Sequence, residues 1–319
     1  MYNLAMKLVI QIPCFNEEQS ISDVIKSIPK KIKGIDEIKI FIIDDGSNDK
    51  TVENAINQGV DKIISFKKRS GLSAVFKKGI EEALKEKADI LVNLDGDNQY
   101  CAYDIEKLIS PILENECDIS IGVRPIDKIK SFSKLKKILQ KLGSKITKLL
   151  TNIDVLDAAS GFRAFNRSAI LNLNVFNPFT YTIETIIQAK YKNLIIKNVE
   201  ISVNEQKNRK SKLFKNNFDY IFKQAKNLIR FFIIYRPARF FVFISFLFLI
   251  PAFIIGFRFL YFYFIGFGKG HIQSLILCAI LFFMSFISFA LAILGDLLSI
   301  NRKLLEDIQY EIKEEKYKK

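Results

Sequence analysis

Two long apolar runs near the end of the chain constrain its fold more than any other feature. Residues 240–257 and 275–295 carry no charged side chain, and a short connector around 266–271 lies between them. A helix needs about 18–20 apolar residues to span the hydrocarbon core of a bilayer. A buried hairpin in a soluble protein is the alternative, and two runs of this length disfavour it. We therefore expect two transmembrane helices, at about 240–264 and 272–296.

Basic residues flank both ends of this predicted hairpin. Arg236 and Arg239 precede the first run, and Arg302 and Lys303 follow the second within a lysine-rich tail. Cytoplasmic flanks of membrane helices are enriched in Lys and Arg. The sequence thus predicts a multi-pass membrane protein with its N-terminal domain and both termini in the cytoplasm. The predicted segments are a globular domain (1–212), a juxtamembrane segment (213–238), the hairpin (239–298) and a basic cytoplasmic tail (299–319).

The juxtamembrane segment has two faces when it is drawn as a helix. Between Phe214 and Tyr235, apolar side chains recur at helical spacing, and Asn, Lys and Arg side chains occupy the opposite face. A basic amphipathic helix beside a hydrophobic anchor typically lies in the membrane surface. A helix that packs against the preceding domain is the alternative.

The N-terminal part of the chain alternates short apolar runs with amphipathic segments. This alternation is typical of an α/β fold, with a mostly parallel, doubly wound sheet flanked by helices. In such sheets ligands bind beyond the carboxyl ends of the strands. The predicted strands are 7–12, 38–43, 62–66 and 90–94, and the segments with helical spacing begin near Glu18, Asp49, Leu72 and Tyr103.

Polar clusters follow the first two predicted strands. Pro13, Phe15 and Glu17 come after the first strand, and Asp44 and Asp45 end the second. Carboxylates there can accept hydrogen bonds from a nucleobase N–H and from ribose hydroxyls. Ordinary helix capping is the alternative, because Asp, Ser and Asn favour helix starts.

A third cluster follows the fourth predicted strand. Asp95 and Asp97 are separated by one glycine, and Gln99 comes two residues later. Hard divalent cations prefer oxygen ligands and often complete their shell with substrate phosphates. The cluster therefore predicts a Mg²⁺ or Mn²⁺ site, where the cation would act as a Lewis acid on a substrate phosphate. An ordinary acidic turn is the alternative.

Composition narrows the classes of partner. The formal charge of +14 fits phosphate-bearing substrates or an anionic lipid surface. Nucleic acid is disfavoured, because much of this charge borders the apolar runs. Four cysteines without a CxxC pair, and a single histidine, disfavour a zinc site or a disulfide framework. Residues 1–11 lack the pattern of a secretory signal peptide.

Four motifs in order, IPCFNEE, IIDDGSNDKT, NLDGDNQ and DAASGFRAF, carry a family resemblance. Together they resemble the GT-A (Rossmann-like) fold of family-2 glycosyltransferases, in particular the dolichyl-phosphate-mannose synthase and polyprenyl-phosphate glycosyltransferase branch. The resemblance covers about residues 7–239. It implies an inverting enzyme that moves a hexose, mannose or glucose first, from a GDP- or UDP-sugar to polyprenyl or dolichyl phosphate at the cytoplasmic membrane face.

The resemblance also implies roles for matched positions. The nucleoside would lie among Pro13, Phe15, Glu17, Asp44 and Asp45, and the diphosphate and metal among Asp95, Asp97 and Gln99. The acceptor phosphate would meet Arg124, Lys136, Ser160 and Arg163, with Arg209, Ser211 and Lys212 in a basic stretch that closes over the site. Lys136 stands where many members carry arginine, which weakens the acceptor assignment because lysine lacks the bidentate fork. For the last group a solvated basic loop is the alternative.

Other acceptors and other protein classes stay open. Transfer to a sugar or glycolipid hydroxyl, as in polysaccharide or cell-envelope glycan synthesis, would need a general base. Asp157 is the candidate base, and a structural carboxylate bonded to backbone or to Arg163 is the alternative.

A processive synthase is disfavoured, since the chain has no tryptophan for the Gln-x-x-Arg-Trp motif. A nucleotidyltransferase, or an adaptor on a decayed transferase domain, is disfavoured by the hairpin and by the intact carboxylates respectively. The sequence is compatible with a homo-oligomer and does not demand one.

Overall fold

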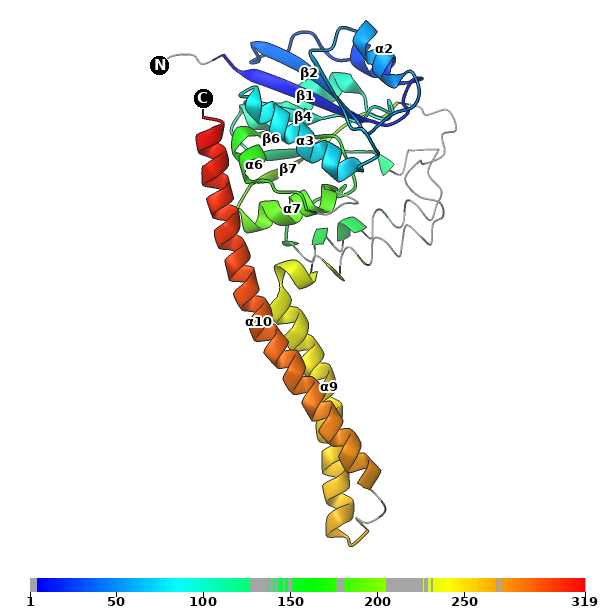
Figure 1. Ribbon diagram of the computed structural model, residues 1–319, viewed down its shortest axis with the longest axis vertical. Helices are drawn as coiled ribbons and strands as arrows, with labels where there is room; N and C mark the ends of the chain where they lie inside the picture. Colours follow the sequence, from blue (N-terminus) through cyan, green and yellow to red (C-terminus); the bar gives the residue numbers. More distant parts are fainter. Residues whose placement is uncertain are drawn as a thin grey trace. The chain divides into compact units, whose positions relative to one another are not determined.

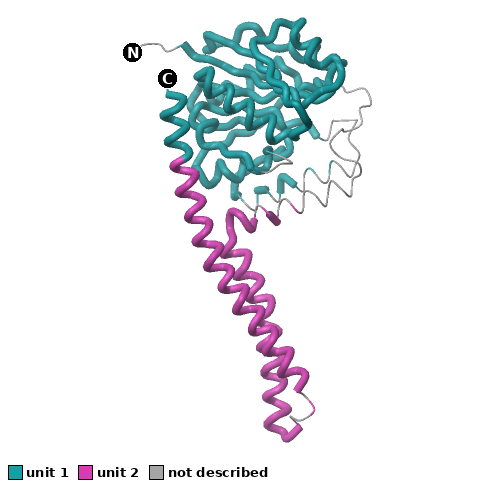
Figure 2. Tube along the Cα trace, viewed as in Figure 1, with its two compact units in different colours: residues 1–214, 309–319 teal, residues 215–308 magenta. Residues whose placement is uncertain are grey.

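The computed structural model describes residues 5–126, 137, 140, 143–145, 147–148, 151–176, 181–204, 226, 229–230, 232–267, 270 and 272–318. The chain divides into two compact units, one formed by residues 1–214 with 309–319 and the other by residues 215–308 (Figure 2).

The first unit is built on a mixed sheet. Within the described residues, seven strands form the order β3-β2-β1-β4-β6-β5-β7. The pairings between these strands are parallel except those of β6 with β4 and with β5. The strands are β1 (Lys7–Cys14), β2 (Glu37–Asp44), β3 (Lys62–Ser65), β4 (Ile90–Asn93), β5 (Ile119–Val123), β6 (Arg163–Asn166) and β7 (Ile196–Glu200).

The register brings the polar clusters to one edge of the sheet. Cys14 at the end of β1 pairs with Asp44 at the end of β2, and Asp44 pairs with Ser65 of β3. On the other side of β1, Gln11 pairs with Asn93, the last residue of β4. The segments that follow β1, β2 and β4 therefore leave the sheet side by side.

Helices cover both faces of the sheet (Figure 1). Side chains of α1 and α4 enter one buried cluster, and those of α3, α6 and α7 enter the other. In α3, Val75, Phe76, Ile80 and Ala83 recur at helical spacing and are all buried, which explains why this segment packs as a helix. The helices are α1 (Ile21–Lys26), α2 (Thr51–Asn57), α3 (Leu72–Lys85), the 3₁₀ turn η1 (Ala102–Asp104), α4 (Ile105–Leu113), α6 (Arg167–Asn172) and α7 (Thr182–Tyr191).

The expected fold class is confirmed. The strands predicted near residues 7–12, 38–43, 62–66 and 90–94 are β1 to β4. The antiparallel β6 fills the place between β4 and β5, so that the sheet is mostly parallel rather than wholly so.

The second unit contains the long apolar helix α9 (Pro237–Phe264) and the part of α10 (Ile272–Lys316) up to residue 308. Each has a stretch with a mean hydropathy of 2.7, of which only 11% and 22% of the residues are buried. A core helix of a soluble protein would be mostly buried, so these exposed apolar faces favour contact with lipid. By length and composition both helices can cross a membrane.

Small and polar side chains join α9 to α10. The Ser245 hydroxyl donates to the Ser285 carbonyl oxygen at 3.0 Å, and the Cys278 thiol donates to the Ala252 carbonyl oxygen at 3.2 Å. Small residues let membrane helices approach closely, and hydroxyls bond across the contact. The predicted hairpin is therefore an interacting pair, with Pro251 inside α9.

The end of α10 differs from the tail expected at 299–319. The helix continues to Lys316, and residues 309–319 belong to the first unit. No glycine or proline occurs after Gly295, and this stretch is rich in Leu, Lys and Glu, which favour helix. Tyr310 and Tyr317 pack against the buried cluster of α3, α6 and α7. The predicted juxtamembrane helix (213–238) falls largely outside the described residues.

Candidate active site

The segment after β2 is fastened to the segment after β3. Oδ1 of the buried Asp45 accepts hydrogen bonds from the backbone N–H of Ser70 at 2.6 Å and of Gly71 at 3.1 Å. The Arg69 guanidinium lies 4.3 Å from the ring centroid of Phe15, and its Nε is 3.9 Å from Oδ2 of Asp45. A flat cation, an aromatic ring and a carboxylate are thus grouped beyond β1 and β2. These three groups suit the stacking and hydrogen-bonding edges of a nucleobase.

The segment after β1 is tied to the turn after β4. The Ser20 hydroxyl donates to the Gly96 carbonyl oxygen at 2.8 Å and lies 3.1 Å from Oε2 of Glu17. The Gly96 N–H donates to the Pro13 carbonyl oxygen at 3.3 Å. Asp44 Oδ1 accepts from the Ser47 N–H at 3.0 Å. This carboxylate therefore also bonds to the backbone of its own turn, the role that was the alternative to nucleoside binding. The expected nucleoside residues are therefore gathered around one edge.

The turn after β4 presents two neighbouring carboxylates. Oδ1 of Asp97 accepts from the Gln99 N–H at 3.0 Å, and Asn98 adopts a left-handed φ of 58°. Burial, reinforced by the nearby Asp97 charge, raises the pKa of Asp95 to about 7. The positive charge of the nearby Arg124 opposes this rise in the pKa of Asp95.

These carboxylates fit a hard divalent cation. Among the described residues no group of three or more His, Cys, Asp or Glu side chains converges. Mg²⁺ is commonly bound by one or two carboxylates, and substrate phosphates and water fill the rest of its coordination shell. Asp95 and Asp97 would hold the ion. Among the described residues, Gln99 forms hydrogen bonds through its backbone N–H, to Asp97, and through its carbonyl oxygen, to the Asn204 N–H.

Asp95 also meets the segment before β6. A Cβ atom built on Gly161 would lie 2.7 Å from Oδ2 of Asp95, so only glycine fits without a shift. The Gly161 N–H donates to the hydroxyl of the buried Tyr100 at 3.0 Å. The DGD turn and the SGFR block, which are far apart in the sequence, therefore lie next to each other.

Arg124 and Asp157 form a buried ion pair. Nε of Arg124 lies 2.7 Å from Oδ2 of Asp157, and Nη2 lies 3.0 Å from Oδ1. Asp157 is fully buried, and Arg124 is 6% exposed. Asp157 thus has the structural bond that was the alternative to a catalytic base, although its partner is Arg124 and not Arg163. A bidentate pair of this kind fixes both side chains.

Arg163 lies inside the domain and not on an acceptor surface. Its side chain is fully buried, and its nitrogens donate to the carbonyl oxygens of Ser160, Ala158 and Thr182 and to the Thr185 hydroxyl. The resemblance implied that Arg163 contacts the acceptor phosphate, but here its guanidinium is bonded within the domain. Since β6 begins at Arg163, its side chain points into the packing against α7. Ser160 is buried as well, and its hydroxyl has no hydrogen-bond partner among the described residues.

Several predicted residues cannot be placed. Lys136, Arg209, Ser211 and Lys212 lie outside the described residues. Ser144, which follows Lys136 in the chain, is described, and its hydroxyl oxygen accepts from the Ala158 N–H at 3.1 Å.

Sequence reasoning missed Tyr100 and the polar residues under the DGD turn. Gln11 and Asn93 are fully buried within the otherwise apolar strands β1 and β4. A polar residue inside an apolar strand was the signal that could have revealed them.

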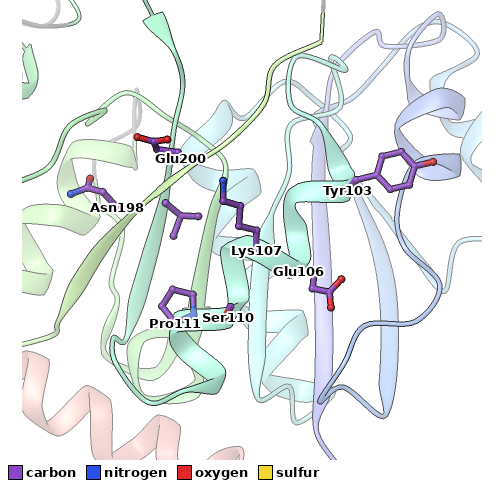
Figure 3. Close-up of a pocket in the computed structure, with 8 residues that line it drawn as sticks. Tyr103, Glu106, Lys107, Ser110, Pro111, Asn198 and Glu200 are labelled. Carbon is purple, nitrogen blue, oxygen red and sulfur yellow. The ribbon is translucent and has the colours of Figure 1, made fainter.

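A groove on the first unit lies away from these residues (Figure 3). This groove has a volume of about 680 Å³ and lies between α4 and β7. None of the predicted site residues that the structure describes lines it. It is lined by Tyr103, Glu106, Lys107, Ser110, Pro111, Asn198, Val199 and Glu200.

Comparison with known proteins identifies relatives of this arrangement. The family model described as "Glycosyl transferase family 2" matches residues 9–173. An uncharacterised protein of Methanocaldococcus jannaschii is 34% identical over 61% of this chain and 80% of its own. Dolichol-phosphate mannosyltransferase of Pyrococcus furiosus is 30% identical over 60% of this chain and 55% of its own. A third relative, UDP-N-acetylglucosamine–dolichyl-phosphate N-acetylglucosaminyltransferase of Methanococcus voltae, is 32% identical over 52% of this chain and 72% of its own length.

A solved structure shares the fold. Glucosyl-3-phosphoglycerate synthase from Mycobacterium tuberculosis, in complex with Mn²⁺, UDP and glucosyl-3-phosphoglycerate, superposes with a TM-score of 0.53. It is 20% identical and covers 72% of this chain and 79% of its own. At this identity the likeness shows the fold alone.

Proposed function

Because the chain belongs to glycosyl transferase family 2, we propose that it transfers a hexose from a nucleoside-diphosphate sugar to a polyprenyl phosphate at the cytoplasmic face of a membrane. That it is a glycosyltransferase follows from the family and its named relatives. We further propose that the hexose is mannose or glucose, that its carrier is GDP or UDP, and that transfer inverts the anomeric carbon.

Two kinds of observation support a lipid phosphate as the acceptor. Named relatives act on dolichyl phosphate or make a dodecaprenyl phosphate sugar. The apolar faces of α9 and α10 are exposed in this chain, which suits an enzyme whose acceptor resides in the bilayer. The proposal places residues 1–212 and both described ends of the chain in the cytoplasm, in accord with the basic flanks of the hairpin.

The observation that carries the choice of acceptor is the Arg124–Asp157 pair. A hydroxyl acceptor needs a general base, and Asp157 is fully buried with both oxygens bound to Arg124. A phosphate monoester is already anionic near neutral pH and can attack without a protein base. The arrangement of Asp157 therefore favours a phosphate over a hydroxyl.

In this mechanism the protein contributes mainly position and charge. A bound Mg²⁺ or Mn²⁺ would neutralise the charge on the leaving diphosphate, held by Asp95 and Asp97. The group formed by Phe15, Asp45 and Arg69 orients the nucleoside. Gly161 lets the acceptor side approach Asp95 closely. In-line attack within such a site inverts the anomeric carbon, and much of the acceleration comes from orientation.

The test is transfer of label from UDP- and GDP-sugars into solvent-extractable lipid. Membranes that contain the full chain are given polyprenyl phosphate and Mg²⁺ or Mn²⁺, with Asp97→Asn as the matched control. Label in a lipid that mild acid releases, absent with the control, is the expected result. Donor hydrolysis without labelled lipid would move the acceptor to a hydroxyl and contradict the proposal.

A further inference from the structure

A buried polar network lies directly under the DGD turn. Gln11 of β1, Asn93 of β4 and Tyr181 are all fully buried. Nε2 of Gln11 donates to Oδ1 of Asn93 at 2.8 Å, and Nδ2 of Asn93 donates to the Tyr181 hydroxyl at 2.9 Å. Burying polar groups costs free energy unless their hydrogen bonds are made. This network crosses two adjacent strands of an otherwise apolar core.

The Asn93 amide is the point where the network reaches the site. Its Nδ2 lies 2.8 Å from the Gly161 carbonyl oxygen and 3.4 Å from Oδ1 of Asp95. The Asn93 side chain thus contacts both the Asp95 carboxylate and the backbone of Gly161, which lies next to that carboxylate. The Tyr181 hydroxyl also lies 3.2 Å from the same Gly161 carbonyl oxygen. Asn93 therefore links the position of Asp95 to that of Gly161.

Neighbouring elements hold the network in a single geometry. The Tyr181 ring stacks on Phe76 of α3, with centroids 3.8 Å apart and planes 8° apart. A Cβ atom on Gly79 of the same helix would lie 1.7 Å from Oε1 of Gln11. The helix α3 thus stacks against Tyr181 through Phe76 and, one turn later, leaves room for Gln11 at Gly79.

We propose that Asn93, oriented by Gln11 and Tyr181, is a positioning residue that aims the Asp95 carboxylate at the divalent cation and holds it against Gly161. The inference rests on the proposed metal role of Asp95 and Asp97. Residues that orient a metal-binding carboxylate typically change metal affinity or activity by about 10- to 100-fold when they are replaced.

Two variants test the network by different routes. Tyr181→Phe removes only the hydroxyl and keeps the ring that stacks on Phe76. Asn93→Ala removes the amide itself. Ser120→Ala is the matched control, since Ser120 is fully buried in β5 and its hydroxyl donates to the Leu108 carbonyl oxygen. If Asn93→Ala does not fold, Tyr181→Phe still decides the question.

The measurement is Mn²⁺ binding to the full-length protein, followed by the paramagnetic resonance signal of free Mn²⁺, with a melting temperature for each variant. Both network variants are expected to bind Mn²⁺ about 10- to 100-fold more weakly than the control at a similar melting temperature. Their donor turnover is expected to recover as Mn²⁺ is raised.

The outcomes separate this inference from the function it rests on. Unchanged Mn²⁺ affinity in Asn93→Ala and Tyr181→Phe, while Asp97→Asn abolishes binding, would overturn the positioning role alone. Unchanged affinity in Asp97→Asn as well would overturn the metal site together with the inference. Mn²⁺ binding that depends on Asn93 in a protein that labels no lipid would support the positioning role and contradict only the acceptor.

Discussion

Gly161 and Asp95 are so close that any side chain at position 161 would touch the Asp95 carboxylate, since a Cβ would lie 2.7 Å from Oδ2. Gly161→Ala is expected to displace this carboxylate and to lower kcat by about 100-fold, the cost of a small misplacement in a positioned site. The check is donor turnover with the melting temperature of the same protein. Gly143→Ala is the control, because a Cβ there meets no described atom within 4 Å. Equal turnover in the two variants would contradict this role of the contact.

Arg69 is expected to contribute to donor binding through Phe15 and Asp45. Arg69→Ala should raise the donor KM roughly 2- to 30-fold, the range of a cation–π contact, with kcat little changed. Lys68→Ala removes the same charge from the same exposed loop and serves as the control. Equal KM values for the two variants would show that the loop acts only through its overall charge.

The Arg124–Asp157 pair is expected to be structural as well as functional. Asp157→Asn leaves the buried Arg124 charge without its carboxylate, which should destabilise the protein by about 3–5 kcal/mol. The double variant Arg124→Met, Asp157→Leu should recover much of this stability but not the turnover. Thermal unfolding and lipid labelling of both proteins check these results. A stable Asp157→Asn protein that loses only hydroxyl transfer would reinstate Asp157 as a base.

Lys313 makes the docking of the last helical turns dependent on pH. Its Nζ donates to the Leu173 carbonyl oxygen at 3.0 Å and to Oδ1 of Asn174 at 2.7 Å. Burial, with the nearby Lys77 charge, lowers the pKa of Lys313 to about 8 from 10.5.

Between those two pKa values the undocked state binds more protons, so docking should strengthen as pH rises from about 8 toward 10.5. Below pH 8 the ammonium is charged in both states, and the full cost of burying it remains. Amide hydrogen exchange of residues 309–318 across this range is the measurement. Lys313→Met should flatten the pH dependence. If the unchanged protein and Lys313→Met showed the same pH dependence, that dependence would come from another titrating group.

Much of the site could be predicted because it follows from strand order. Once β1, β2 and β4 are neighbours in a parallel arrangement, the residues after Cys14, Asp44 and Asn93 must meet at one edge. The two apolar runs likewise needed only length and composition.

Other features depend on packing between distant segments, which no local pattern records. Arg124 and Asp157 are 33 positions apart, and their pairing is set by how the chain returns from β5 to β6. The SGFR motif marked Arg163 as a phosphate ligand, yet the approach of α7 surrounds this side chain with carbonyl oxygens. The apolar run marked only the part of α10 that can span a membrane, because the charged residues that continue the helix to Lys316 carry no such signal.

The chain leaves its first compact unit after residue 214 and re-enters it at residue 309. The apolar hairpin is therefore an insertion, covalently bounded on both sides by one folding unit. A single proteolytic cut between α9 and α10 would leave each helix attached by the chain to a part of that unit. A cut between residues 214 and 237 would leave residues 1–214 joined to α10 only through the docking of residues 309–319, so the strength of that docking decides whether one cut releases the domain.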